Sequence, residues 1–575
     1  MAKALKRVPY GQASFVGLRK FGYAFVDKTP FIQTLERGTQ FPFLVRPRRF
    51  GKSVFANMLA AYYDKAAKAD FEKNFAGTWI GEHPTPLASQ YLVLQFDFSG
   101  IEPGEELVAG FISNVKTGLI TFQSRYLGDD PRVEAVLNAT YVSPARLLSD
   151  FLNLALKKLK PEEKIYLIID EYDQFAQTVL SSDPGTFRAM AGKDGFLKAF
   201  YAVIKRFSTI LIEWAFITGV TSISLDSMTS GFNIARNLTL NPAFSTMLGF
   251  TDSELRGLIP QLVDIERYGH SVDEIFDHMK VLYDGYRFSP DSEASVFNAS
   301  MCLYYLGEIA ETGHEPAVLL DPAFSVDLSK IEGVLSLGRK AFVEEVVADV
   351  LFDRSIESLG MSPAINLNAA SGLSERDVLT ALVCMGFLTF SSEDSGRLVC
   401  PNRAVKNLFF QYWFERIKPF DEMAFPIGSR KKAMASLAGG DIRPFLEFVG
   451  EALKGSVGLH VLAHLNETAI QLAAAMAVNT DAIYRVTAEE EALGAGYTDL
   501  ILRPGKGHPE AAGWVIEFKY LKKSETTKSA VEAKLAEAVA QLGRYAKSEN
   551  IAAIARCRLA AAAFSGTELK ALKVL

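Results

Sequence analysis

Cysteine and histidine are scarce in this chain, and neither forms a pattern typical of metal binding or disulfide bonding. Among 575 residues there are four cysteines and seven histidines, with no C-x-x-C pair and no H-E-x-x-H motif. We therefore do not expect a disulfide framework or a structural zinc site. The cysteine usage fits the reducing cytoplasm, which is where we expect the protein to be.

Long apolar runs and an excess of positive charge are also missing. No uncharged run reaches the roughly 18 residues that a membrane helix needs, and no apolar segment follows the basic stretch Met1–Arg7. We therefore predict a soluble chain with neither a signal peptide nor a membrane partner. The net charge of −6 provides no general basic field, so any binding of nucleic acid has to come from a local patch.

The chain is too long for one hydrophobic core, and its composition is that of an ordinary globular protein, with 49% hydrophobic and 22% charged residues. Its first half contains short apolar segments separated by stretches with helical spacing, a pattern that favours an α/β fold with a buried parallel sheet. We expect these strands at Phe41–Val45, Tyr91–Phe98, Ile165–Asp170 and Ile210–Thr218.

The remainder of the chain divides into a helical region and a second, smaller α/β unit. Amphipathic helices are expected at 252–262 and 272–284, and a helix at 374–385 followed by a hairpin (386–400) resembles a winged helix, which serves ATPases as a packing or lid module more often than as a DNA reader. A linker is expected near Pro426–Gly440. Beyond it we expect helices at 466–478 and 530–545 and strands at 482–486, 498–502, 514–519 and 558–564. The expected domains are 1–250, 251–430 and 431–575.

A candidate phosphate-binding loop needs support from elsewhere in the chain, because the tripeptide Gly-Lys-Ser alone is common. Here the tripeptide ends a longer motif and precedes an expected helix (Val54–Tyr63), and the motif reads Arg46, Pro47, Arg48, Arg49, Phe50, Gly51, Lys52, Ser53. Phosphate binding needs backbone N–H groups, a helix N-terminus and a cation. Lys52 would reach the phosphates of ATP and Ser53 would bind Mg²⁺, although Arg46 stands where G-x-x-x-x-G-K-[ST] has its first glycine. Arg48 and Arg49 could contact phosphate or pair with acids.

The support comes from two other strand ends. The expected strand Ile165–Asp170 ends in Asp170 and Glu171, which would hold the Mg²⁺ shell and activate the attacking water, respectively. A solvent-exposed pair of acids is the alternative interpretation. Thr218 ends the next expected strand, where it could sense the γ-phosphate or could simply cap the strand.

Several motifs in this half of the chain are shared with a known family. They are Val8-Pro-Tyr10, Tyr23–Thr29, Arg46–Ser53, Asp170–Asp173, Thr218–Val220 and Tyr283–Tyr286. Together they resemble the predicted AAA-ATPase-like family, whose loop also lacks the first glycine and whose members typically carry a nuclease-like C-terminus. The resemblance implies that Asp27 and Lys28 lie near the nucleotide or pack the N-terminal strand against it, although Asp27 could equally form a surface ion pair. We interpret Tyr283–Tyr286 as a structural turn.

A second constellation lies near the C-terminus. Strand periodicity places Glu517 and Lys519 on one face, and pairing with the expected strand 498–502 would bring Asp499 to Glu517. Two carboxylates would bind Mg²⁺, and the lysine would orient or deprotonate the attacking water and stabilise the developing charge. A surface ion pair between Glu517 and Lys519 is the alternative.

This pattern, Asp followed by Glu-x-Lys, resembles the PD-(D/E)XK nuclease superfamily over about residues 455–575. The resemblance implies that Glu467 is a further metal ligand, and Gln541 and Tyr545 match residues that the superfamily often has on the following helix. Lys522, Lys523 and Lys528 could contact a phosphate backbone or could form a solvated face.

We therefore predict an ATP-binding and ATP-hydrolysing protein coupled to a Mg²⁺-dependent nuclease that cuts nucleic acid, DNA rather than RNA, in defence or repair. A homo-oligomer is compatible with this interpretation. The alternative is a nucleotide-dependent switch whose nuclease-like domain binds nucleic acid or protein without cutting. In a third interpretation both motifs are coincidental.

Overall fold

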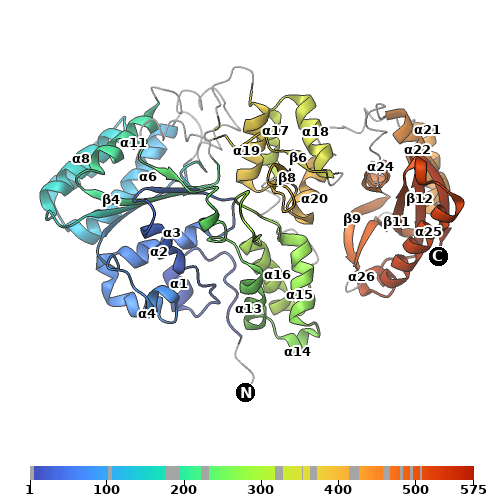
Figure 1. Cartoon of the computed structure of the whole chain (residues 1–575), viewed down its shortest axis with the longest axis horizontal. Coiled ribbons are helices and arrows are strands. Elements are labelled where there is room, and N and C mark those ends of the chain that lie inside the picture. The colour runs from blue at the N-terminus through green and yellow to red at the C-terminus, as the bar shows by residue number, and fades with distance from the viewer. Residues whose placement is uncertain are drawn as a thin grey trace. The chain divides into compact units, whose positions relative to one another are not determined.

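The computed structural model describes residues 5–101, 106–174, 195–221, 232–316, 321, 328–351, 354–362, 365, 372–412, 427–456, 467–479, 483–492, 496–505 and 508–575. These residues form two compact units (Figure 1), the first made of Met1–Val346 and Ser355–Leu408, the second of Val347–Arg354 and Phe409–Leu575. Both contain helices and sheets, which confirms the predicted α/β class. The three-domain division remains a prediction.

The first unit is built on a five-stranded parallel sheet in the order β2-β3-β4-β1-β5. Its strands are β1 (Pro42–Val45), β2 (Leu92–Asp97), β3 (Ile165–Asp170), β4 (Ile212–Gly219) and β5 (Arg236–Asn237). The four predicted strands are confirmed, and β5 was not predicted. Every residue of β1 and β3 is buried, because helices cover both faces of the sheet (Figure 1).

The helices of the first unit surround this sheet and continue into the middle of the chain. They are α1 (Phe15–Lys20), α2 (Pro30–Glu36), α3 (Lys52–Tyr63), α4 (Phe71–Phe75), α5 (Trp79–Glu82), α6 (Leu107–Phe122), α7 (Pro131–Asn138), α8 (Pro144–Lys158), α11 (Phe196–Phe207), α13 (Asp252–Leu262), α14 (Ile265–Tyr268), α15 (Val272–Tyr283), α16 (Ala299–Thr312), α17 (Leu328–Ser336) and α19 (Glu375–Met385). Helices α18 (Lys340–Leu351) and α20 (Arg403–Tyr412) each contribute residues to both units. Within the ranges given above, no helix combines the length and apolarity of a membrane span.

The helices predicted for the middle of the chain are present, and their N-termini are capped by side chains. Thr251 begins α13 and Ser271 begins α15, each in a capping box with a glutamate three positions on. Helix α19 leads into a small sheet of β6 (Ile356–Glu357), β8 (Arg397–Val399) and β7 (Thr389–Phe390), in that order. Helix and hairpin therefore follow each other as the winged-helix interpretation expects.

The second unit has a five-stranded mixed sheet in the order β13-β12-β11-β10-β9. The strands are β9 (Tyr484–Ala492), β10 (Gly496–Pro504), β11 (Gly513–Leu521), β12 (Cys557–Ser565) and β13 (Glu568–Val574), and the helices are α21 (Ile427–Gly439), α22 (Arg443–Ser456), α24 (Glu467–Asn479), α25 (Lys528–Tyr545) and α26 (Glu549–Ala552). Strand β13 was not predicted. The expected linker at Pro426–Gly440 is wrong, because α21 occupies it and buries Met434 and Leu437 in the core.

Glycine at position 285 allows a close approach behind the phosphate loop. Its φ is +94°, and a Cβ there would lie 2.1 Å from the carbonyl oxygen of Pro401. We expect Gly285→Ala to lower the free energy of unfolding of the first unit by more than about 2 kcal/mol, through both strain and collision. Unfolding by denaturant, monitored by circular dichroism, measures this change in the free energy of unfolding.

Gly257→Ala is the matched control, because a Cβ added to Gly257 on α13 would meet nothing within 4 Å beyond the backbone of its own helix. It should be neutral or stabilise by about 0.5–1 kcal/mol. Equal effects of the two substitutions would show that the contact with Pro401 is unimportant.

Candidate functional site

The phosphate loop connects β1 to the 12-residue helix α3. Gly51 precedes the helix with φ of +95°, and Arg49 also has a positive φ of +69°. The backbone therefore takes left-handed conformations at Arg49 and Gly51, directly before the first turn of α3. A helix N-terminus with a lysine in its first turn favours an anion.

The side chain of Arg46 is turned into the protein core. It is 1% exposed, and its guanidinium donates hydrogen bonds to the carbonyl oxygens of Val45 and Thr239 (both 2.8 Å) and of Phe244 (2.9 Å). The guanidinium also lies 4.4 Å from the ring centre of Phe288. Burial lowers the pKa of Arg46 to about 9, so it stays charged at neutral pH. This placement supports a structural role, joining β1 to the segment after β5.

Later parts of the first unit hold the rest of the loop. Phe50 packs edge-on against Tyr286 and Phe288, with ring centres 4.8 and 5.2 Å apart, and its carbonyl accepts from the N–H of Gly249 at 2.9 Å. A Cβ on Gly386 would lie 2.8 Å from Pro47. The Tyr283–Tyr286 turn and the winged-helix-like region therefore form the support behind the loop.

Lys52, Ser53, Asp170 and Glu171 come together at the carboxyl ends of β1 and β3. Lys52 is 4% exposed, and its Nζ lies 3.2 Å from the Pro47 carbonyl and 3.6 Å from Oε1 of Glu171. Burial raises the pKa of Asp170 to about 6, opposed by a hydrogen bond with Ser53 and reinforced by the charge of Glu171. Glu171 has φ of +50°, and its buried Oε2 lacks a hydrogen-bond partner.

Thr218 lies between these two strand ends, on β4, and is fully buried. Its Oγ1 donates to the carbonyl of Leu44 at 2.8 Å, so the side chain bridges β4 to β1. Asp173, to which the sequence assigned no role, is also fully buried and accepts from the N–H groups of Val220 and Thr221 at 3.0 and 2.7 Å. Its place in the shared Asp170–Asp173 motif is the signal that could have found it.

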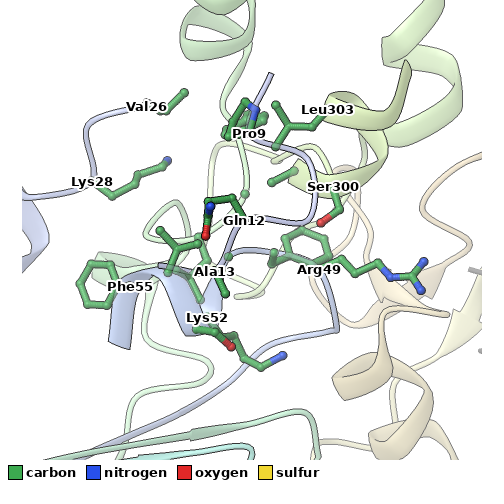
Figure 2. Close-up of a pocket in the computed structure, with 18 of the residues that line it drawn as sticks. Pro9, Gln12, Ala13, Val26, Lys28, Arg49, Lys52, Phe55, Ser300 and Leu303 are labelled. Atoms are coloured by element: carbon green, nitrogen blue, oxygen red, sulfur yellow. The ribbon is translucent and has the colours of Figure 1, made fainter. Parts of the chain in front are cut away.

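The other charged residues of the family motifs have protein partners. Arg48 donates to the side chain of Gln174, and Arg49 lies 3.8 Å from Asp321. Asp27 accepts from the N–H groups of Thr29 and Trp79, and Lys28 pairs with Glu254 at 2.7 Å. A pocket of about 270 Å³ lies beside Lys52 and Ser53, and Figure 2 shows Arg49 directed away from the other labelled residues.

The C-terminal constellation is formed where β10 and β11 separate. The ladder of the two strands pairs Leu500 with Ile516. Beyond that pair the Oδ2 of Asp499 accepts the N–H of Phe518 at 2.6 Å, in place of a strand carbonyl. Val515 lies in the core under α25 and Ile516 in the core on the other face, so the predicted alternation of β11 is confirmed.

Lys519 lies among the carboxylates. Its Nζ lies 3.0 Å from Oε1 of Glu517 and 3.3 Å from Oε1 of Glu467, the residue at the start of α24. Burial and the neighbouring acids raise the pKa values of Asp499 and Glu517 above the usual range. Burial would lower the pKa of Lys519, but the same acids outweigh it and raise that pKa. Glu517 is 2% exposed, so the surface-ion-pair alternative does not describe this cluster.

The donor set suits Mg²⁺ in kind, since carboxylate oxygens are its usual protein ligands. The buried Oε2 of Glu517 has no hydrogen-bond partner, which leaves one acceptor for a cation. However, within the described part of the chain, no group of three or more aspartate, glutamate, histidine or cysteine side chains is arranged so that it could hold a metal ion. Here the ammonium of Lys519 supplies the positive charge.

Helix α25 carries two further expected residues, and one of them, Tyr545, lies near this cluster. Tyr545 is buried, and burial together with the charges of Glu517 and Asp499 raises its pKa to about 12. The Oε1 of Gln541 is buried without a hydrogen-bond partner. Lys522 and Lys528 are exposed, so both are accessible to a polyanion.

Comparison with known proteins adds to this geometry. Residues 9–229 match the family model described as "Predicted AAA-ATPase". Residues 465–573 match the model of the PD-(D/E)XK nuclease superfamily. Both predicted resemblances are thereby confirmed. The AAA-ATPase-like region contains the whole phosphate loop and Asp170, Glu171 and Thr218, and the nuclease-like region contains all four residues of the C-terminal cluster.

One curated relative is an "Uncharacterized protein in vnfD 5'region" of Azotobacter chroococcum mcd 1, 27% identical over 335 residues. The aligned part covers 56% of this chain and 56% of that protein. The match therefore spans only a little over half the length of either protein, and its printed name assigns no activity.

The raised pKa of Asp170 predicts that replacing this carboxylate with a neutral amide increases the stability of the protein, by an amount that depends on pH. In the unfolded chain this carboxyl has its usual pKa of 3.8, and in the folded protein about 6. The cost of burying its charge is therefore absent below about pH 4 and complete above about pH 6. Asp170→Asn should stabilise the nucleotide-free protein by on the order of 1–3 kcal/mol at pH 7 and by little at pH 4.

Thermal unfolding of the wild type and of Asp170→Asn from pH 4 to 8 measures the difference in their stabilities. Groups that titrate equally in both proteins do not contribute to this difference. Asp70→Asn is the control, because Asp70 is exposed and its side chain does not cap the helix that follows. A stability difference between Asp170→Asn and the wild type that does not change with pH would contradict the prediction.

Proposed function

We propose that the protein binds and hydrolyses ATP and that this activity is coupled to a Mg²⁺-dependent nuclease in the C-terminal unit. One observation carries the proposal: each unit brings together distant residues that its chemistry requires. Lys52 and Ser53 of α3 meet Asp170 and Glu171 at the end of β3, and Lys519 of β11 meets Glu467 at the start of α24.

In the ATPase site the proposed roles follow from position. Lys52 would exchange its contacts with Pro47 and Glu171 for phosphate oxygens, assisted by the N–H groups of Gly51 to Ser53. Ser53 and Asp170 would hold Mg²⁺, which supplies charge neutralisation for the phosphates when bound. Glu171, released from Lys52, would accept a proton from the attacking water. Arg46 and Thr218 would support the loop without touching the nucleotide.

In the nuclease site Asp499, Glu517 and Glu467 would hold Mg²⁺, which when bound polarises the phosphodiester. Lys519 would leave Glu467 to orient water and to stabilise the negative charge that develops on the phosphate. The exposed Lys522 and Lys528 would bind the phosphate backbone of the nucleic acid. The proposal also includes four points that rest on analogy with the fold alone. They are DNA as the substrate, a role in defence or repair, a cytoplasmic location and a homo-oligomeric state.

The second candidate is a nucleotide switch that holds nucleic acid or a protein without cutting. The observation that favours it is the paired state of Lys519, which lies among the acids that the metal would need. The two candidates differ in metal-dependent cutting.

ATP hydrolysis should depend on Lys52 and Glu171 in different ways. Lys52→Ala should weaken ATP binding by about tenfold or more, because it removes the cation. Glu171→Gln should leave binding within about threefold and lower kcat by roughly 100-fold or more, because it removes the base. Calorimetry and phosphate release measure the two effects.

The exposed residues Lys68 and Glu72 provide the matched controls, Lys68→Ala and Glu72→Gln. Unchanged hydrolysis in both site variants would exclude this ATPase mechanism.

Cutting should require Mg²⁺ and the carboxylate–lysine cluster. We expect Asp499→Ala and Lys519→Ala to reduce cleavage by at least about 100-fold, since each removes a ligand or a charge at the reacting phosphate. Plasmid, linear and single-stranded DNA and RNA, with and without ATP and with EDTA, form the substrate panel. Glu532→Ala and Lys547→Ala, at exposed positions, are the controls. Binding of DNA without metal-dependent cutting by the wild type would favour the switch.

A further inference from the structure

The turn after β3 holds Glu171, the proposed base, in a conformation that is unfavourable for a glutamate. Its φ of +50° lies in the left-handed region, which residues with a Cβ seldom adopt. The turn is closed by a hydrogen bond of 3.1 Å from the N–H of Gln174 to the carbonyl of Glu171. Such a backbone persists only where the surrounding contacts impose it. The next two residues of the turn, Tyr172 and Asp173, supply those contacts.

Asp173 joins this turn to the segment that follows β4. Its carboxylate is fully buried and accepts a hydrogen bond from the N–H of Val220 at 3.0 Å. It accepts two more from Thr221, one from the N–H at 2.7 Å and one from the hydroxyl at 2.6 Å. Hydrogen bonds to a charged acceptor are about twice as strong as neutral ones, and these three satisfy a carboxylate whose burial would otherwise be costly. Asp173 therefore holds the ends of β3 and β4 together.

Tyr172 adds two further hydrogen bonds to the same segment. Its N–H donates to the carbonyl of Thr218 at 3.1 Å, and its hydroxyl donates to the carbonyl of Thr221 at 2.5 Å. The last residue of β4 has to be a glycine for this approach, because a Cβ on Gly219 would lie 2.3 Å from Oδ1 of Asp173 and 2.4 Å from the ring of Tyr172. Residues from both strand ends are thus required for the contact.

The end of β4 is also bonded to the start of the phosphate loop. The carbonyl of Gly219 accepts from the N–H of Arg46 at 3.1 Å. Both the turn after β3 and the phosphate loop are therefore fixed to one strand end. The position of Glu171 relative to Lys52 depends on the hydrogen bonds of Asp173 for this reason, and the resulting distance between Oε1 of Glu171 and Nζ of Lys52 is 3.6 Å.

We propose that Asp173 is the positioning residue of the ATPase site, which holds Glu171 where its carboxylate can accept a proton from the attacking water. The inference rests on the proposed ATP hydrolysis and adds the residue that fixes the geometry of the base. A displacement of about 1 Å at a reacting group can lower a rate about 100-fold. Loss of the Asp173 carboxylate should therefore reduce kcat. The affinity for ATP, which depends on Lys52 and the N–H groups of the loop, should change little.

The test introduces Asp173→Asn into the full-length wild type and into Glu171→Gln. Asparagine keeps the size of the side chain, but its NH₂ group would face an N–H or hydroxyl that now donates to the carboxylate. Calorimetry measures the affinity for the Mg²⁺ complex of ATP, phosphate release measures kcat, and circular dichroism shows that each variant is folded. Asp70→Asn is the matched control, because Asp70 is exposed.

We expect Asp173→Asn to lower kcat by about 30-fold or more, with the affinity for ATP within about threefold of the wild type. In Glu171→Gln the base is already absent, so the same substitution should lower the remaining rate by less than about threefold. A merely structural role would lower both rates by the same factor. Asp70→Asn should leave kcat and affinity unchanged in either background.

Thr221 provides a second test in case Asp173→Asn fails to fold. Thr221→Val removes the hydroxyl that donates to Asp173 and keeps a side chain of similar shape, whereas Thr221→Ser keeps the donor. We expect Thr221→Val to lower kcat about threefold or more and Thr221→Ser to stay within about twofold of the wild type, both with unchanged affinity for ATP.

Wild-type kcat in the folded Asp173→Asn variant, or equal kcat in Thr221→Val and Thr221→Ser, would overturn the assignment. An equal loss of rate with and without Glu171 would also overturn it, as would a loss of ATP affinity as large as the loss of kcat. A wild type that does not hydrolyse ATP, or a Glu171→Gln variant as active as the wild type, would reject the underlying ATPase mechanism and the role of Asp173 with it. Those two results are obtained without any substitution of Asp173, so the two kinds of failure are distinguishable.

Discussion

Because the guanidinium of Arg46 is buried, its two terminal nitrogens need hydrogen-bond acceptors, and the positions of those acceptors determine how the phosphate loop is supported. They are carbonyl oxygens of Val45, Thr239 and Phe244, and the ring of Phe288 lies against the guanidinium. A charge in this position is costly unless its donors are used. The residue that replaces the usual glycine therefore ties the loop to acceptors 193 and 198 residues later in the chain. The loop cannot reach this conformation before those segments pack.

This dependence explains why the middle of the chain belongs to the same compact unit as the parallel sheet. Phe50 is enclosed by Tyr286 and Phe288, Pro47 lies against Gly386, and the carbonyl of Asp284 accepts from Asn402 at 2.8 Å. Each contact joins the loop, directly or through the turn at Gly285, to the winged-helix-like region. A displacement of the loop would therefore be transmitted to that region by packing, so the region acts as part of the support of the loop in this structure.

The sequence was sufficient for the features that depend on local chemistry. Strands β1 to β4 were predictable because each is a short, mainly apolar run, completely buried in β1 and β3 and partly exposed in β2 and β4. Lys52, Asp170, Glu517 and Lys519 were recognisable as candidate site residues by residue type and spacing. The errors have equally local causes. Strand β5 has only two residues and β13 is a lysine-containing edge strand, so neither shows an apolar run, and the glycines around α21 concealed its buried Met434 and Leu437. The inward direction of Arg46 and the role of Asp173 depend on acceptors and donors contributed by other parts of the fold, which no local pattern encodes.

The two candidate sites share one electrostatic arrangement. In each, burial raises the proton affinity of carboxylates, and a lysine lies within reach of them: Lys52 is 3.6 Å from Glu171, and Lys519 is 3.0 Å from Glu517. A buried carboxylate needs either a proton or a cation. In this structure the lysines provide that cation. When a ligand binds either lysine, the neighbouring carboxylates lose its positive charge, and the ligand must supply another positive charge to them. A Mg²⁺ complex of a phosphate meets both demands at once, because its anion pairs with the lysine while its cation pairs with the carboxylates. Neither phosphate nor metal alone does so, and the joint requirement is a physical reason for both sites to respond to the complex and not to its parts.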